Sequence, residues 1–218
     1  MDIKKLYLVY FSPGGNTEKV VKLIGTKLAG ELDAEAYAID FTSPEMRNAQ
    51  YSFDEDALVI FGMPTYAGRV PNKLLAFLQD GFKGNATKAV AVTTFGNRSF
   101  DSSPTELSLE LYKNGFDIFA AASFACQHHF SKVIGTARPD DDDVAEIEKF
   151  ALSIAQWLSK SEAKCIEHRN ILAESEVKPY YIPLGEDMQP AKFLKAVPKT
   201  VEELCDGCGV CVKACPVA

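Results

Sequence analysis

The sequence predicts an α/β protein with a parallel sheet that helices cover on both faces. Apolar runs without polar interruption indicate strands that are buried on both sides. Segments with helical periodicity separate these runs, and a helix between two strands is the usual connection in a parallel sheet. The apolar runs occupy residues 6–11, 57–61, 88–94 and 116–124.

The first half of the chain supplies one helix and a weaker strand. A helix is expected at residues 17–29, because Val20, Val21, Ile24 and Leu28 recur on one face, and Gly30 can end it. Residues 34–40 alternate weakly and fit an edge strand. Residues 41–56 are expected to form a loop.

Three further helices are expected in the second half of this unit. Proline starts those at residues 71–78 and 104–112, and Asn114-Gly115 closes the latter. The third follows the acidic run at residues 140–143 and continues to about Leu158. That run lies where the helix dipole favours negative charge, so we interpret it as structural.

The composition excludes several classes of function. The chain has 218 residues, is 47% apolar and carries a net charge of −7, which argues against nucleic acid and anionic membranes as partners. It suits a partner with a basic docking face. No apolar run is long enough to span a bilayer and no signal peptide is visible, so we expect a cytoplasmic protein without membrane insertion.

A glycine-rich turn joins the first strand to the first helix. Its sequence is Ser12-Pro13-Gly14-Gly15-Asn16-Thr17. Backbone N–H groups and the positive end of the helix converge there, which favours a phosphate, although a well-capped polar turn is the alternative. The turn lacks the lysine of a triphosphate loop and the spacing of dinucleotide folds, so a monophosphate fits better. It resembles the FMN phosphate loop of the flavodoxin family.

Two more loops follow buried strands. The residues 62–71, Gly-Met-Pro-Thr-Tyr-Ala-Gly-Arg-Val-Pro, are similar to a loop found after the third strand of many flavodoxin-like proteins. An aromatic ring and accessible backbone groups are what a flavin needs, although a proline-fixed connection from strand to helix is the alternative. The expected cofactor-binding residues of this loop are Pro64, Thr65, Tyr66, Ala67 and Gly68.

The last of the three loops departs from classical flavodoxins, whose equivalent tends to be acidic and to carry an aromatic cover. Its expected cofactor-binding residues are Thr94, Phe95, Gly96, Asn97 and Arg98. Arg98 near the pyrimidine edge would stabilise an anionic reduced flavin. The alternative is that Arg98 points to solvent or pairs with Asp101.

The resemblance implies a flavodoxin-like domain over residues 1–160. Its five-stranded parallel sheet would have the order 2-1-3-4-5, with FMN between the first and third strands. His128 and His129 follow the last strand and are interpreted as polar residues of a surface loop. The alternative is that they approach the flavin edge or the iron–sulfur tail as proton donors. Cys126 is expected in the core.

The C-terminal cysteines give the most specific signal. Cys205, Cys208, Cys211 and Cys215 precede Pro216 at the spacing of the bacterial ferredoxin motif, which binds a 4Fe-4S cluster. Zinc is the alternative, but zinc sites usually separate their two cysteine pairs by a longer loop. In two-cluster ferredoxins the fourth cysteine serves the other cluster, so we expect residues 201–218 to be a partial, truncated ferredoxin-type segment. The alternative is that Cys215 closes a single cluster.

A proline-rich connector at residues 161–200 is expected to join the two parts, packing through Tyr180, Tyr181 and Ile182. Together they resemble fused flavodoxin–ferredoxin proteins, which implies FMN, a 4Fe-4S cluster and electron transfer between redox partners. An FMN-dependent reductase of a small molecule, fed by the iron–sulfur segment, is the alternative. A third hypothesis is an empty fold with a structural zinc tail. The sequence identifies neither the electron partner nor the oligomeric state.

Overall fold

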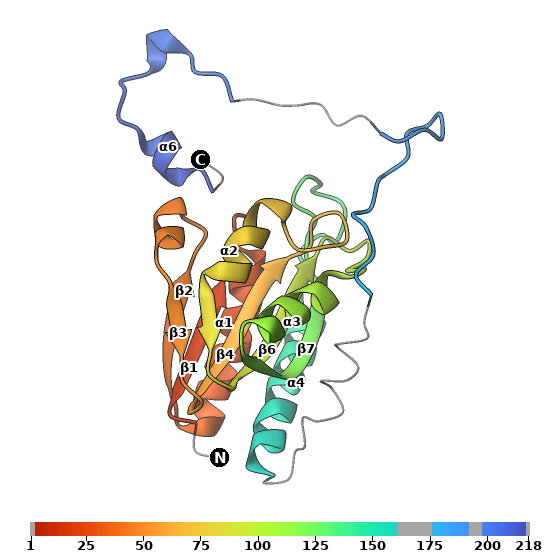
Figure 1. Cartoon of the computed structure of the whole chain (residues 1–218). Helices are drawn as coiled ribbons and strands as arrows, with labels where there is room; N and C mark the ends of the chain where they lie inside the picture. The colour runs from red at the N-terminus through yellow and green to blue at the C-terminus, as the bar shows by residue number, and fades with distance from the viewer. Residues whose placement is uncertain (1–2, 161–175, 192–197, 217–218) are drawn as a thin grey trace.

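The computed structural model describes residues 3–160, 176–191 and 198–216, and a parallel sheet of five strands forms its centre (Figure 1). The strand order is β2-β1-β4-β6-β7, which confirms the predicted order. The apolar runs therefore became neighbouring strands, with the weakly alternating segment at one edge. Their bounds are β1 Lys5–Tyr10, β2 Glu35–Asp40, β4 Ala57–Pro64, β6 Thr87–Phe95 and β7 Phe116–Ala125.

Helices cover both faces of the sheet (Figure 1). Helices α1 (Asn16–Leu32) and α4 (Asp141–Ser159) pack on one face, where they share a core with Leu58 and Ile60 of β4. Helices α2 (Leu75–Asp80) and α3 (Ser103–Lys113) pack on the other, against Val59 and Phe61. Successive side chains of β4 thus point into two separate cores, which is why the apolar run at residues 57–61 has no polar positions.

Two sequence expectations for the first half were wrong. Helix α1 does not stop at Gly30 but continues to Leu32, where Asp33 takes the left-handed conformation with φ 50°. Residues 41–56 are not a plain loop, since they contain the 3-10 helix η1 (Pro44–Asn48) and strand β3 (Tyr51–Phe53). Strand β3 pairs in parallel with β5 (Phe82–Gly84) to form a second, two-stranded sheet.

The remaining helices begin and end much as expected. The segment begun by Pro71 opens with the 3-10 helix η2 (Asn72–Leu74) and continues as α2. Gly115 follows α3 with φ 87°. Asp140 and Asp143 form a reciprocal capping box at the start of α4, which confirms the structural role of the acidic run.

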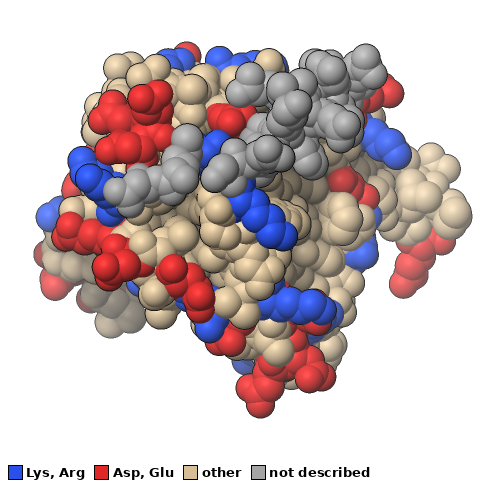
Figure 2. All heavy atoms as spheres, turned by 90° about the horizontal axis from the view of Figure 1, so that it is seen from below, with Lys and Arg blue, Asp and Glu red and all other residues tan. Residues whose placement is uncertain are grey.

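The face opposite the predicted cofactor loops carries mixed charge. Figure 2 shows this face from below, with lysine and arginine interspersed among aspartate and glutamate. Among the described residues, no helix is long and apolar enough to cross a membrane.

Beyond α4, the described parts are residues 176–191 and a tail, residues 198–216, with η3 (Glu202–Leu204) and the short helix α6 (Val210–Ala214). In Figure 1 the tail lies above η1, at the same end of the sheet as the loops that leave β1, β4 and β6. Residues 161–175 and 192–197 of the predicted connector, Cys165 among them, lie outside the described residues.

Candidate functional site

The turn after β1 is shaped for close approach to backbone N–H groups. Gly15 precedes α1 in the left-handed conformation with φ 79°, and nothing lies within 4 Å of the position where its Cβ would be. Ser12 closes the turn: its carbonyl accepts from Gly15 N–H (3.2 Å), and its Oγ accepts from Glu18 N–H (3.0 Å). The N–H groups of Asn16 and Thr17 donate to no other group among the described residues. Two free donors at a helix start fit a phosphate.

Neighbouring loops hold this turn in place. Ser12 N–H donates to Thr42 Oγ1 (2.8 Å), and Asn16 Nδ2 donates to the carbonyl of Gln127 (3.0 Å). Two segments distant in sequence therefore hold the candidate phosphate loop in place.

The loop after β4 turns back on itself beside the first. Tyr66 and Arg69 exchange backbone hydrogen bonds of 2.8 and 3.1 Å, while Ala67 and Gly68 have φ values of 50° and 81°. Thr65 N–H donates to the carbonyl of Thr94 (2.7 Å), which joins this loop to the third. The Tyr66 side chain is 46% exposed, and partial burial raises the pKa of its phenol. It is therefore both fixed at its base and accessible to a ligand.

The loop after β6 is joined to both of the others. Thr94, at the end of β6, is buried and its hydroxyl meets that of Thr17 at 2.8 Å. Asn97 has φ 63° and accepts from Arg138 Nη1 (2.9 Å). Arg98 pairs with Asp101, and its guanidinium carbon lies 4.0 Å from the ring centre of Tyr181. The structure thus adopts the pairing that the sequence left as an alternative, and contact with a flavin stays a prediction.

The segment after β7 lies across two of these loops, which sequence reasoning missed. A Cβ added at Gly14 would lie 2.8 Å from His129 Nδ1, and one added at Gly96 would lie 2.6 Å from His128 Cδ2. Each imidazole therefore rests on a glycine of a different candidate cofactor loop. The glycines at positions 14 and 96 were visible in the sequence, but their partners were not.

Residues 176–184 form a segment that packs against the loop after β4. Tyr181 N–H donates to the carbonyl of Ala67 (2.7 Å), and the Tyr180 hydroxyl donates to that of Val70 (3.0 Å). The Arg69 guanidinium lies 4.5 Å from the ring centre of Tyr180. Packing through both tyrosines is confirmed, whereas Ile182 is 61% exposed and does not pack as expected.

Aromatic side chains gather on the second and third loops and on the segment that packs against them, and we call this group the aromatic rim. Phe95 and Phe100 meet edge to face with ring centres 5.6 Å apart, and Phe100 is 43% exposed. Tyr66 and Tyr181 are exposed to a similar degree. Sequence reasoning identified Tyr66 and Phe95 as site residues, named Tyr181 only as a packing residue and missed Phe100.

The four tail cysteines have free thiols, and Cys215 is the only one of them that is half-buried. No three His, Cys, Asp or Glu side chains in the described ranges are close enough to hold a metal ion. Gly207 and Gly209, both with positive φ and open space around them, leave the backbone free to wrap. The donor set of four thiols fits an iron–sulfur cluster, and metal binding is what gathers so short a segment.

A hydrogen bond joins Arg47 of the main domain to the tail. Arg47 Nη2 donates to the carbonyl of Pro216 (2.6 Å). Burial lowers the pKa of Arg47, and the nearby Cys215 thiol opposes that shift.

Two comparisons with known sequences concern the tail and the chain as a whole. Residues 198–218 match the family model of the 4Fe-4S binding domain. No curated protein sequence matches the chain.

Solved structures match the larger part. Flavodoxin 2 from Bacillus cereus, in its oxidised form, is 20% identical with a TM-score of 0.50, covering 70% of this chain and 98% of its own. An NADH:FMN oxidoreductase (EMOB), in its apo form, is 16% identical with a TM-score of 0.51, covering 79% of this chain and 100% of its own. The chain therefore combines a flavodoxin-like fold with a C-terminal segment that matches the 4Fe-4S binding domain family.

Proposed function

We propose that this protein is an electron-transfer flavoprotein that binds FMN at the carboxyl edge of the sheet and a 4Fe-4S cluster in the tail. The observation that carries the proposal is the joining of three loops at one point of a flavodoxin-like sheet. Thr94 contacts both Thr17 of the first loop and Thr65 of the second. This point lies where β1 and β4 adjoin, the switch point at which doubly wound sheets bind ligands.

Each loop has a distinct role in holding FMN. Residues 12–17 hold the phosphate through the free N–H groups of Asn16 and Thr17, with the Ser12 and Asn16 side chains at the rim. Tyr66 offers its exposed ring to the flavin, and the backbone of residues 64–68 lies within reach of the ring edge. The backbone of residues 94–98 would approach the flavin from the side opposite residues 64–68.

The tail contributes four thiolate ligands to the second redox group. A flavin carries one or two electrons and a cluster carries one, so a protein holding both converts between one- and two-electron partners. The chain's own part is to hold the two groups in one molecule and to exclude water from the flavin ring. The free thiols suit a reducing, cytoplasmic compartment, and the acidic surface suits a redox partner with a basic docking face.

The aromatic rim favours electron transfer over reduction of a small molecule. Tyr66, Phe100 and Tyr181 are 46%, 43% and 45% exposed, and in this proposal their rings cover the flavin, whereas a reductase needs open space above the ring for its substrate. A reductase remains the alternative function, and the reoxidation of the reduced protein by small molecules distinguishes it.

The test is an anaerobic reduction titration of protein loaded with FMN, iron and sulfide. We expect flavin and iron–sulfur absorption in one chain, with cluster and flavin each taking up electrons. Absence of flavin uptake would overturn the FMN assignment. Rapid reoxidation by a panel of quinones and nitro compounds, with saturation in each, would instead favour the reductase.

A further inference from the structure

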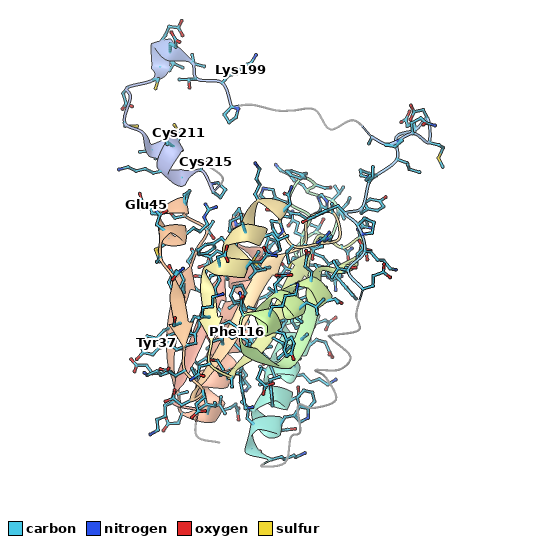
Figure 3. All side chains as sticks on the ribbon, in the orientation of Figure 1. Tyr37, Glu45, Phe116, Lys199, Cys211 and Cys215 are labelled. Carbon is cyan, nitrogen blue, oxygen red and sulfur yellow. The ribbon has the colours of Figure 1, made fainter. Side chains whose placement is uncertain are left out.

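The strongest unexplained contact joins the tail to the main domain. Arg47 Nη2 donates to the carbonyl of Pro216, the residue directly after the last cysteine of the motif, at 2.6 Å. Figure 3 shows Cys211 and Cys215 on the tail just above the turn that carries Glu45. Cys215 is half-buried there, while Cys205, Cys208 and Cys211 are exposed. The end of the motif, and not its beginning, is therefore the part that lies against the domain.

Two hydrogen bonds within its own turn also hold the guanidinium of Arg47. It donates to the carbonyls of Ser43 (3.4 Å) and Thr42 (3.3 Å), both in the turn after β2. The Nη2 atom that donates to Thr42 is also the atom that donates to Pro216. A planar group with five fixed donors can bridge three carbonyls in this way, which a lysine ammonium on a flexible stem does less well.

The same turn touches the candidate phosphate loop. Thr42 Oγ1 accepts from the N–H of Ser12 at 2.8 Å. A short path of hydrogen bonds thus runs from Pro216 through Arg47 and Thr42 to Ser12. The turn connects the cysteine motif to the loop that opens the cofactor site.

We propose that the turn at residues 42–47 is a docking surface for residues 215–216 of the same chain, with Arg47 as its anchor. The proposal concerns contacts of the protein chain alone and does not depend on FMN binding. The geometry supports it, because the planar guanidinium of Arg47 is bonded to the carbonyl of Pro216 and the preceding residue, Cys215, is half-buried. Docking at this turn keeps the motif at the edge of the sheet where the cofactor loops lie.

Chemical crosslinking of the full-length, reduced and metal-free chain tests this directly. Glu45→Cys places a thiol on the docking turn, and a short bismaleimide then joins it to whichever tail cysteine is near. We expect intramolecular links to Cys215 to exceed links to Cys205 by about fivefold, the ratio that one net hydrogen bond would produce. Peptide mapping by mass spectrometry identifies the linked pair.

A matched control is available at the opposite end of the strands. Glu55 is also exposed but lies just before the start of β4, far from the carboxyl ends of the strands. Glu55→Cys should give no preferred link to Cys215. Combining Glu45→Cys with Arg47→Ala should reduce the preference for Cys215 to the level of Cys205.

Three results would overturn the proposal: equal linkage to Cys205 and Cys215 from position 45, equal linkage from positions 45 and 55, or links only between two molecules. The comparison of positions 45 and 55 requires no change at Arg47. It therefore decides the question even if Arg47→Ala loosens the turn.

Discussion

The hydroxyl of Thr17, in the first turn of α1, lies 2.8 Å from the hydroxyl of Thr94, at the end of β6. Both residues are buried, at 2% and 4% exposure. One hydroxyl must donate and the other accept, so each satisfies the other away from water. This pair fixes the candidate phosphate loop to the third loop from inside the protein.

We predict that Thr17→Val or Thr94→Val alone lowers the free energy of unfolding by about 1–3 kcal/mol, because each leaves one buried hydroxyl unpaired. The double variant should cost less than the sum, since neither hydroxyl is then present. Urea denaturation of the four proteins measures the coupling. Additive effects would show that the two hydroxyls do not depend on each other.

The second prediction concerns charge at the phosphate loop. Gly15→Asp should abolish FMN binding, because a carboxylate would lie beside the phosphate. Gly15→Asn is the matched control: asparagine has the same shape and tolerates the φ of 79°, but carries no charge. It should retain binding in a fluorescence titration. A Gly15→Asp variant that purifies with bound flavin would disprove the phosphate assignment.

The third prediction concerns Tyr66 and its proposed contact with the flavin ring. Tyr66→Ala should weaken FMN binding by roughly 0.5–1.5 kcal/mol beyond the lost area, the contribution of one aromatic pair. Tyr66→Phe should bind nearly as well, because the ring remains. Tyr112→Ala, which removes a similarly exposed tyrosine from α3, should leave the dissociation constant unchanged. An unaltered constant in Tyr66→Ala would remove this residue from the ring site.

Much of the fold was predictable because its signals are local. The run at residues 57–61 is apolar at every position, and the helical face of Val20, Val21, Ile24 and Leu28 is fully buried in the structure. Strands β3 and β5 were missed because three residues are too few to show a period, and they pair across about thirty residues of chain. The end of α1 was misplaced because an aspartate, and not the nearby glycine, adopts the left-handed cap.

The candidate site was predictable only as separate loops. Nothing in the sequence indicates that Thr17 meets Thr94, or that Tyr181 N–H reaches Ala67. The positions of His128 and His129 follow from the fold of the segment after β7, where His128 N–H bonds the carbonyl of Ile134. Such contacts depend on which loops the sheet order brings together, and they have no periodic signature.

The fourth prediction concerns Cys126, whose burial confirms the core assignment. Burial raises the pKa of its thiol to about 12, above the ordinary value of 9.0. The folded protein therefore binds this proton more tightly than the unfolded chain, so its contribution to stability is complete below pH 9 and is lost as the pH rises toward 12. Stability should fall less steeply over that range in Cys126→Ala than in the wild type. Identical slopes would show that this thiol does not titrate with folding.

The last prediction assigns the metal ligands by using Cys126 as an internal control. Cys205, Cys208 and Cys211 stand at the spacing that binds three corners of a 4Fe-4S cluster. Their free, exposed thiols are accessible to iron and sulfide, whereas the Cys126 thiol is buried and protonated. Serine at any of the three positions should therefore lower the iron content of anaerobically reconstituted protein, because a hydroxyl is a poor substitute for a thiolate ligand.

Cys126→Ser should leave the iron content unchanged, and all these variants should still bind FMN, because no loop of the flavin site lies in the tail. Cys215→Ser then separates two ligand sets. Loss of iron would make the four tail cysteines one complete set, while retention would give Cys215 a different role, as in ferredoxins whose fourth cysteine serves another cluster. Full iron content after replacement of Cys208 would contradict the iron–sulfur assignment itself, since the metal would then be bound elsewhere.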